Sequence, residues 1–258
     1  MPTRQLSIIL ASLSAAWALS GCAGMGHHAE QHADKPHWSY SGHGGADQWG
    51  ELQADYATCK LGQQQSPIDI QGAAKAALPP LGVNYVPGTA EVVNNGHTIQ
   101  VNLAPGSSVQ LASGRYQLLQ FHFHTPSEEK IDGKSYPLVA HLVHRNDEGK
   151  LAVVAVLFTE GRANPTLAKV FAAMPAQADA KAPLPEALNP AALLPASLGY
   201  YAFMGSLTTP PCSEGVHWQV LKQTVELSPE QLAAFRQLYP MNARPTQALN
   251  GRPVQESQ

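Results

Sequence analysis

The feature that most constrains the fold of this chain is a pair of short segments that combine histidines with apolar residues. Residues 121–124 read Phe-His-Phe-His, and residues 140–144 read Ala-His-Leu-Val-His. Because side chains alternate between the two faces of a β-strand, His122 and His124 are predicted to project from one face and the phenylalanines from the other. The first segment is therefore predicted to be a strand that carries two imidazoles on one side.

A turn signal between the two segments predicts how they pair. The Asp-Gly dipeptide at 132–133 is typical of β-hairpins and would return residues 137–145 beside the first strand. His141 can then face the first two imidazoles, whereas His144 points to the opposite face. Three neutral imidazoles with no fourth protein ligand fit a catalytic Zn²⁺ site that keeps one position open for water. The alternative is that these are hydrogen-bonded strand histidines without a metal.

The length and composition fit one large β-rich domain or two small ones. The chain has 258 residues, of which 44% are hydrophobic and 14% are charged, so a sizeable core can form without cross-links. Twenty-one glycines and 21 prolines indicate many turns and few long helices. The net charge of -3 gives no support for nucleic-acid binding.

Periodicity and turn signals predict a mainly β fold with few short helices. Ser228 can cap a helix that has Pro at its first position and Gln at the capping-box position and that extends to about residue 239. A shorter helix is predicted at 166–173. No repeat or break in composition divides residues 37–256, which predicts one domain. Strand-like runs occupy residues 92–103, 108–112, 115–125, 137–145, 151–160, 200–208 and 216–225.

The first residues have the features of an export signal. Arg4 precedes an apolar run over residues 6–19, which is short for a membrane span. The run ends in Leu-Ser-Gly-Cys, which resembles a bacterial lipobox whose cysteine is lipidated and becomes the new N-terminus. We therefore predict a lipoprotein signal peptide over residues 1–21 and a lipid anchor at Cys22. A plain secretory signal cleaved nearby is the alternative.

This prediction places the protein in the periplasm or cell envelope, where its membrane contact is the lipid alone. Residues 22–36 are predicted to be a polar, histidine-rich tether. With Cys22 lipidated, Cys59 and Cys212 remain as a pair in an oxidising compartment, which predicts a disulfide between them. Two free, buried thiols are the alternative.

A series of motifs, in order along the chain, resembles the α-class carbonic anhydrases of the bacterial, exported kind. Any one of them is a weak signal, but together they cover essentially all of residues 37–256. The resemblance implies a single domain around a large, mostly antiparallel twisted sheet, with zinc in a conical cleft. The motifs are Trp38-Ser-Tyr40, Gln65-Ser-Pro-Ile-Asp-Ile70, Asn94-Asn-Gly-His97, Gln120-Phe-His-Phe-His124, Ser127-Glu128, His141-Leu-Val-His144, Ser206-Leu-Thr-Thr-Pro-Pro211 and Asn242-Ala-Arg-Pro245.

The resemblance implies a zinc-dependent lyase that reversibly hydrates carbon dioxide to bicarbonate and a proton. One Zn²⁺ per chain on His122, His124 and His141 would lower the pKa of its bound water from about 15.7 to about 7, a value established for carbonic anhydrases themselves. Zinc-bound hydroxide would then attack CO₂ without a general base. Because CO₂ is apolar, it needs a dry wall beside the metal. The expected substrate-binding residues are Thr208 and Thr209 together with an apolar wall of Val143, Val153, Leu207, Val216 and Trp218. Each of these apolar residues alone fits an ordinary core equally well.

Two further roles follow from the resemblance. The Thr208 hydroxyl would accept a hydrogen bond from the hydroxide and donate its single proton to Glu128, which aims an oxygen lone pair at CO₂. His97, at the rim of the cleft, is expected to carry the released proton away because histidine titrates near neutral pH. Without the three histidines, Thr208 would be interpreted as part of a polar turn and Glu128 as an exposed carboxylate.

The resemblance also implies hydrogen-bond acceptors for the metal-binding imidazoles. Gln120 is the expected partner of His122, and a backbone carbonyl near Asn242 is the expected partner of His124. These acceptors orient each ring and fix which nitrogen carries its proton.

The third imidazole departs from the family pattern. The residue two before the third histidine is usually a Glu that orients it, but here it is Val139; the residue after Ser-Glu is often a His, but here it is Glu129. We predict that Glu129 reaches the same space and accepts the ring N–H of His141. In the alternative, Glu129 points to solvent and a water molecule supports His141.

Two other functions compete with CO₂ hydration. The domain could bind zinc or a partner without turnover, but a non-catalytic relative would be expected to lack at least one of the residues named above. Another zinc hydrolase is the second alternative. The chain has no His-Glu-x-x-His motif to support a peptidase, and ester hydrolysis is at most a side reaction of an open zinc site.

Overall fold

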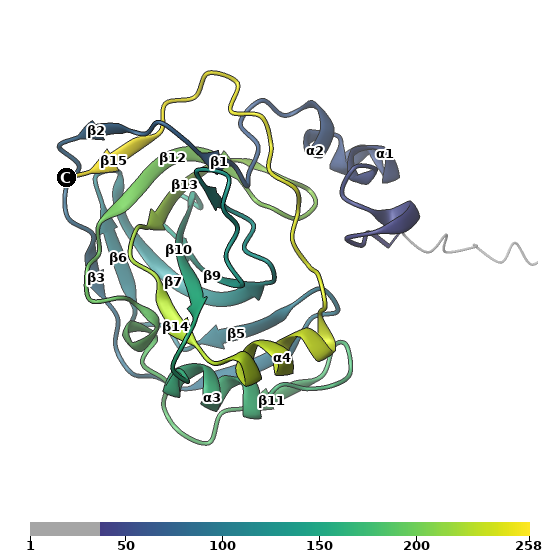
Figure 1. Ribbon diagram of the computed structural model, residues 1–258, viewed down its shortest axis with the longest axis vertical. Coiled ribbons are helices and arrows are strands. Elements are labelled where there is room, and N and C mark those ends of the chain that lie inside the picture. The colour runs from purple at the N-terminus through teal and green to yellow at the C-terminus, as the bar shows by residue number, and fades with distance from the viewer. Residues whose placement is uncertain (1–36) are drawn as a thin grey trace, which may run out of the picture. The chain divides into compact units, whose positions relative to one another are not determined.

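The computed structural model describes residues 37–258 (Figure 1). The predicted signal peptide at 1–21, the predicted anchor Cys22 and the tether at 22–36 lie outside the described residues. Between residues 37 and 258, no helix combines the length and the apolar character that crossing a membrane requires. The described part is a single domain built around one large twisted sheet with short helices around it, as the sequence predicts.

The large sheet contains most of the strands. Its main path runs β11-β4-β5-β7-β9-β10-β13-β12-β15-β2, with β6 on β7, β3 on β6 and β14 on β10. The strands are β2 (Ala74–Ala76), β3 (Gly82–Asn84), β4 (Ala90–Asn94), β5 (Ile99–Leu103), β6 (Ser108–Leu111), β7 (Gly114–His124), β9 (Leu138–Arg145), β10 (Leu151–Glu160), β11 (Lys181–Pro183), β12 (Tyr200–Ser206), β13 (Glu214–Leu221), β14 (Val225–Leu227) and β15 (Gln255–Ser257).

The other elements are short. A separate pair of strands consists of β1 (Asp69–Ile70) and β8 (Lys130–Ile131). The α-helices are α1 (Trp49–Leu52), α2 (Thr58–Leu61), α3 (Pro165–Ala172) and α4 (Pro229–Leu238), and single 3₁₀ turns span Gly42–Gly44, Ala54–Tyr56 and Pro190–Leu193.

The large sheet is mixed, with antiparallel pairing dominant. Only β10–β13, β10–β14 and β15–β2 pair in parallel within it. At its centre β9 is antiparallel to both of its neighbours, β7 and β10, and a short connection joins β9 to β10. The prediction of a mostly antiparallel sheet is therefore confirmed, with parallel pairs at β10 and at one edge.

The central strand β10 spans the predicted residues 151–160. Its apolar run is buried on both faces between β9 and β13, because a strand at the centre of a sheet with two covered faces has no side that contacts water. Strand β9 is buried along almost its whole length for the same reason. This burial gives the strands that carry the histidines a fixed position.

The predicted strand at 92–103 is wrong as a single element. Residues 92–103 belong to a hairpin of β4 and β5, which pair with each other. The turn forms because Gly96 adopts a positive φ of 82° and the Asn95 side chain accepts hydrogen bonds from the backbone N–H groups of His97 and Thr98. Local turn chemistry thus interrupts a run whose alternation continues on both sides.

The predicted strand at 216–225 also divides into two elements. Strand β13 ends at Leu221, and β14 begins at Val225 and pairs with a later part of β10. The other predicted strands are present with boundaries that differ by one or two residues. Helix α4 has the predicted capping box, in which Ser228 and Gln231 exchange side-chain and backbone hydrogen bonds.

The two faces of the sheet pack against different groups of apolar residues. On one face, Phe121 and Phe123 are fully buried, and Phe123 contacts Phe171 of α3 and Phe235 of α4 at ring-centroid distances of 5.3 and 6.0 Å. Burial of each such ring contributes roughly 1.5–3 kcal/mol to folding. The alternation in β7 therefore turns the histidines toward the opposite face.

The predicted disulfide between Cys59 and Cys212 is present. It joins α2 to the segment that precedes β13, across 153 residues of sequence. Both cysteines are buried in a small cluster with Trp49.

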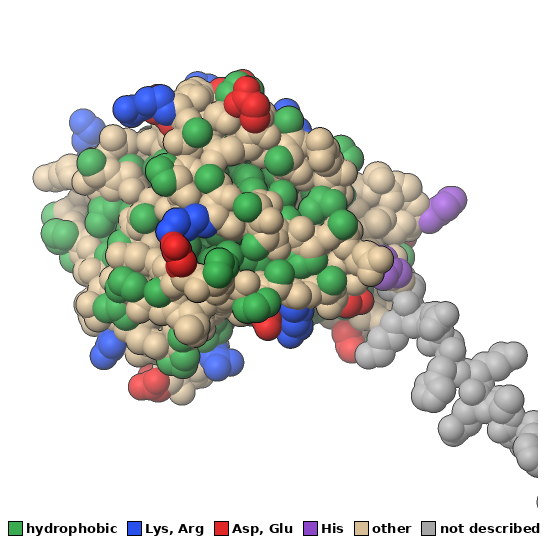
Figure 2. Space-filling view, turned by 90° about the horizontal axis from the view of Figure 1, so that it is seen from below, with side chains coloured by type: hydrophobic (Ala, Val, Ile, Leu, Met, Phe, Trp, Pro, Cys, Tyr) green, Lys and Arg blue, Asp and Glu red, His purple; other side chains and the backbone are tan. Residues whose placement is uncertain are grey.

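One face of the molecule is shown in space-filling form in Figure 2. Charged side chains on it are few and lie among apolar and uncharged ones, and Lys and Arg do not gather into a patch there.

Candidate metal centre

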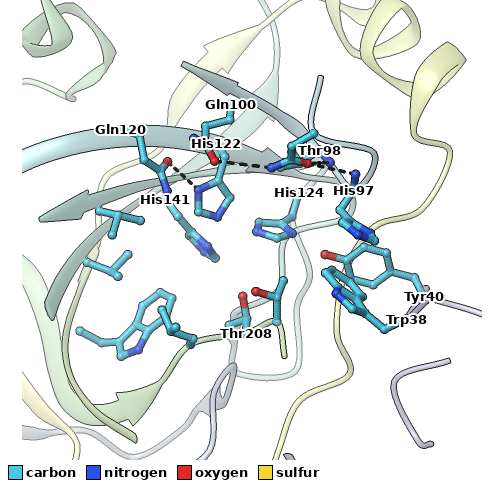
Figure 3. A pocket seen from close by; sticks show the side chains of 16 residues that line it. Trp38, Tyr40, His97, Thr98, Gln100, Gln120, His122, His124, His141 and Thr208 are labelled. Atoms are coloured by element: carbon cyan, nitrogen blue, oxygen red, sulfur yellow. Dashed lines mark hydrogen bonds between the residues drawn. The ribbon is translucent and has the colours of Figure 1, made fainter. Parts of the chain in front are cut away.

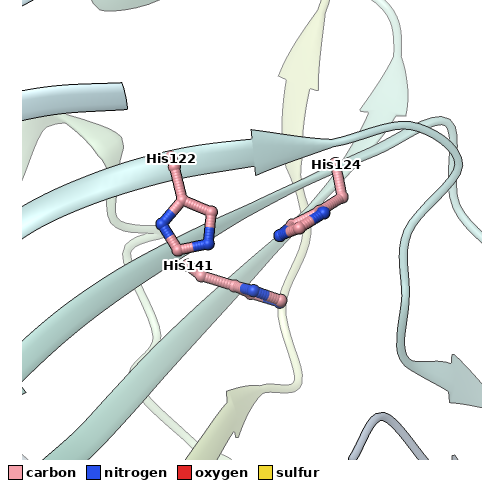
Figure 4. A group of neighbouring side chains, drawn as sticks. All are labelled: His122, His124 and His141. Atoms are coloured by element: carbon pink, nitrogen blue, oxygen red, sulfur yellow. The ribbon is translucent and has the colours of Figure 1, made fainter. Parts of the chain in front are cut away.

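The three predicted histidines come together on one face of the sheet (Figure 4). His122 and His124 lie on β7, and His141 lies on β9 directly opposite His122 in the strand register. One potential ligand atom from each residue lies within 4.8 Å of those of the other two. His144 points to the other face, where its Nε2 lies 2.7 Å from the hydroxyl of Tyr85. The facing of all four side chains agrees with the sequence prediction.

The first two imidazoles each donate one ring N–H to an oxygen. His122 Nδ1 lies 2.9 Å from Gln120 Oε1, and His124 Nδ1 lies 2.7 Å from the backbone carbonyl of Asn242. Because a carbonyl oxygen only accepts, the proton of each neutral ring is on Nδ1 and the lone pair is on Nε2. Burial lowers the pKa of His122 to about 3 and lowers the pKa of His124 well below its ordinary value, so both rings are neutral at pH 7.

The third imidazole lies between two carboxylates. His141 Nε2 is 3.1 Å from Glu129 Oε2, and His141 Nδ1 is 3.8 Å from Glu128 Oε2. Both carboxylates are at most 1% exposed. Burial acts to lower the pKa of His141, but Glu129 and Glu128 together raise it above its ordinary value. The contact between Glu129 and His141 is the one that the departure from the family pattern predicts.

The free ring nitrogens match the needs of a metal ion. Two of them are Nε2 atoms and the third, on His141, is an Nδ1 atom, and they face one another across a short space (Figure 4). His124 Nε2 is buried and has no hydrogen-bond partner among residues 37–258. A buried polar atom without a partner costs about 1–3 kcal/mol. A tetrahedral Zn²⁺ with three nitrogen ligands fits this donor set.

A cleft of about 240 Å³ opens beside the three imidazoles (Figure 3). Its polar lining residues include Gln100, Gln120, Thr208 and Thr209. Four of the five predicted wall residues also line the cleft. The apolar lining residues are Val143, Val153, Leu207 and Trp218.

The fifth predicted wall residue, Val216, does not line the cleft. It is 2% exposed and packs in the apolar cluster with Phe203 and Trp218. Val216 and Trp218 share a face of β13, but only the larger indole side chain extends as far as the cleft. Strand alternation alone therefore does not distinguish a wall residue from a core residue.

Glu128 lies beside two of the free ring nitrogens. Its Oε1 accepts a 2.8 Å hydrogen bond from the backbone N–H of Arg244, and its Oε2 is 3.5 Å from His124 Nε2. Burial and the neighbouring carboxylate of Glu129 raise the pKa of Glu128 to about 7, whereas His141, the Thr208 hydroxyl and the Arg244 N–H act to lower it. Oε2 has no fully formed hydrogen bond within the described part of the chain.

His97 lies at the rim of the cleft and stacks on Trp38 (Figure 3). The two ring centroids are 3.6 Å apart and the rings are inclined by 9°. The exposed ring of His37 also stacks with His97, at a centroid distance of 5.1 Å. Burial, and then the charge of His37, lower the pKa of His97 to about 4, although Asp179 acts to raise it.

Sequence reasoning gave no role to several residues of this site. Trp38, Tyr40 and Gln100 line the cleft, and the Tyr40 hydroxyl is buried without a partner among residues 37–258. Arg244 donates its backbone N–H to Glu128, and its guanidinium donates to three groups near the disulfide. Trp38, Tyr40 and Arg244 occur within the motifs quoted above, but a motif without coordinates does not indicate what each side chain contacts.

Comparison with known proteins identifies the family. A family model for eukaryotic-type carbonic anhydrase matches residues 44–258. A carbonic anhydrase of Pectobacterium carotovorum is 47% identical over 220 residues, which cover 85% of this chain and 90% of the relative. The structure of the α-carbonic anhydrase from Thermovibrio ammonificans with the inhibitor sulfanilamide matches with a TM-score of 0.84 and 47% identity, over 86% of this chain and 99% of that one.

A structure of dioscorin in complex with ascorbate is also similar, with a TM-score of 0.80 and 32% identity over 85% of this chain and 97% of that one. Over nearly the whole described length, sequence and structure therefore agree on one assignment. This chain belongs to the eukaryotic-type, or α-class, carbonic anhydrase family.

Proposed function

We propose that this protein catalyses the zinc-dependent, reversible hydration of carbon dioxide to bicarbonate and a proton. The observation that carries the proposal is the arrangement of His122, His124 and His141, in which one nitrogen of each ring contacts an oxygen and the other faces the common space. Zn²⁺ held there would supply hydroxide at neutral pH by lowering the pKa of water to about 7, as is established for carbonic anhydrases.

Thr208 and Glu128 orient the reacting oxygen. The Thr208 hydroxyl has one proton, and an ionised Glu128 can only accept it. The Thr208 oxygen is then left as an acceptor, so the reacting oxygen donates its own proton to Thr208 and directs a lone pair into the cleft. The Arg244 N–H that donates to Glu128 favours the ionised carboxylate against the effect of burial.

The apolar side of the cleft receives the substrate. CO₂ has no hydrogen to donate and little affinity for water, so it partitions to a dry surface. Val143, Val153, Leu207 and Trp218 form such a surface on the lining of the same cleft as the three imidazoles. Thr209 gives a polar edge to this surface. His97 at the rim removes the proton that the reaction releases.

The competing function is binding without turnover. The similarity to the structure of dioscorin in complex with ascorbate supports testing it. CO₂ hydration should be measured with the purified protein, after zinc removal with a chelator, and after zinc is added back. We expect activity that is lost on chelation and restored by zinc. Bound zinc with no hydration of CO₂ would favour the binding function instead.

We propose that Glu129 is a positioning residue for the zinc ligand His141. Support comes from the 3.1 Å contact between Glu129 Oε2 and His141 Nε2 and from the complete burial of the carboxylate. Glu129→Gln keeps the size of the side chain but removes its charge. Loss of such a partner typically weakens metal binding about 10- to 100-fold. Zinc affinity, measured by competition with a chelator, should fall by this factor.

A second variant separates a lost charge from general damage to the site. Val139 lies two residues before His141 on the same face of β9 and is fully buried, so a carboxylate at 139 is within reach of the same ring. Adding Val139→Glu to Glu129→Gln is expected to restore zinc affinity. Zinc affinity that is unchanged in Glu129→Gln alone would support the alternative in which water holds His141.

We also propose that the protein is exported and anchored by lipid at Cys22, which lies outside the described residues. The apolar run at 6–19 and the Leu-Ser-Gly-Cys that ends it support this proposal. Mass spectrometry of the membrane fraction should detect a diacylglyceryl-modified peptide that begins at Cys22. A mature protein that begins elsewhere and retains no modified Cys22 would refute the anchor.

A further inference from the structure

Two histidines stack at the mouth of the cleft, and the proposed function uses only the inner one. His97 is half-buried against Trp38, whereas His37 is exposed to solvent and its ring centroid is 5.1 Å from that of His97 with an inclination of 27°. The backbone at His97 is held by Asn95, which accepts from the N–H groups of His97 and Thr98. The pair therefore forms a path of two imidazoles from the rim to solvent.

The lowered pKa of His97 means that this residue holds a proton only briefly. Burial and then the charge of His37 lower the pKa of His97 to about 4, and Asp179 is the charged group that opposes them. A base whose pKa is about three units below neutrality holds a proton only about one thousandth of the time at pH 7. A proton taken up by His97 must therefore leave quickly, and a second base beside it shortens that step.

We propose that His37 is the outer base of a two-histidine relay that carries protons from the cleft to solvent. In this relay His97 binds a proton at one ring nitrogen and releases a proton from the other. The free ring nitrogen of His37 then binds the released proton. His37 then gives it to a buffer base in solvent. Both imidazoles return to the neutral form, and no electron is transferred. This inference rests on the proposed CO₂ hydration.

The test compares His37→Ala with a matched control, His43→Ala. His43 is an exposed histidine in the nearby 3₁₀ turn Gly42–Gly44 and, unlike His37, does not stack on His97. In weak buffer at saturating CO₂, His37→Ala should reduce kcat on the order of tenfold, which is below the loss of about 10²-fold or more for a direct acid–base group. The kcat/KM value should not change, because the relay acts after the chemical step. His43→Ala should match the wild type.

Buffer and a double variant show whether His37 acts through His97. Concentrated imidazole buffer should restore kcat of His37→Ala, because it replaces the outer base. His97→Ala should reduce kcat at least as much, and combining it with His37→Ala should add little, since two residues of one path are not additive. Fully additive losses would overturn the relay.

An NMR titration of the His97 ring gives a readout that does not depend on turnover. Because the charge of His37 lowers the pKa of His97, His37→Ala should raise that pKa, whereas His43→Ala should not change it. An unchanged pKa, or a kcat of His37→Ala equal to that of the wild type in weak buffer, would overturn the relay alone. A zinc-loaded wild type without CO₂ hydration would instead overturn the proposed function and the relay with it.

Discussion

His124→Ala is expected to abolish tight zinc binding and nearly all hydration of CO₂. The buried Nε2 of His124 is one of three ring nitrogens that face one another, and its Nδ1 is held by the Asn242 carbonyl. Two imidazoles alone cannot enforce tetrahedral coordination, because catalytic zinc sites use three protein ligands and one open position. Zinc content after dialysis and the rate of CO₂ hydration measure the two effects.

His144→Ala is the matched control for this experiment. It removes a fully buried histidine from the neighbouring strand, but its side chain lies on the opposite face of the sheet and contacts Tyr85. Folded His144→Ala should retain one zinc per chain even if it unfolds more readily. An active His124→Ala protein with one tightly held zinc would refute the assignment of the metal centre.

The metal centre could be predicted from sequence because it depends on the period of a strand. Alternation places His122 and His124 on one face, and the apolar side chains between them are buried on the other. The only long-range information needed is the pairing of β7 with β9. The apolar run at 151–160 predicts a central strand beside β9, since a strand covered on both faces must lie inside the sheet.

Other parts of the site could not be predicted because their contacts join residues far apart in sequence. Arg244 reaches Gln65 and the carbonyl of Cys59, and its backbone N–H holds Glu128. No periodicity links these positions. The hairpin between β4 and β5 differs from the predicted strand for another reason, because the alternation of apolar residues continues on both sides of the Asn-Gly turn that precedes His97. That turn is what brings His97 to the rim.

The contact between Glu129 and His141 could be predicted from a departure from the family pattern. The absence of Glu at position 139 and the presence of Glu at 129 predicted a contact between the loop residue and His141. The contact is present at 3.1 Å, between groups that are both at most 1% exposed. The prediction rests on chemistry, because a buried ring N–H requires an acceptor. Periodicity would not have produced it.

Removal of the disulfide is expected to cause the largest loss of stability. The bridge closes 153 residues, for which the chain-entropy model gives a loss of about 5 kcal/mol in the free energy of unfolding. Replacing Cys59 and Cys212 together with serine, and measuring urea unfolding at a fixed zinc concentration, tests this value. Zinc must be fixed because a ligand that binds only the folded state adds to apparent stability.

The same change should also affect the cleft. The carbonyls of Cys59 and Cys212 accept hydrogen bonds from Arg244 Nη2 and Gln65 Nε2, and Arg244 also holds Glu128. Without the bridge this network loses its anchor, so we expect lower CO₂ hydration at temperatures where the protein is still folded. Reduction of the wild type should reproduce both effects, whereas Cys22→Ser, which keeps the bridge, should produce neither. If reduction lowers the free energy of unfolding by less than about 1 kcal/mol, the buried core stabilises the fold without the bridge.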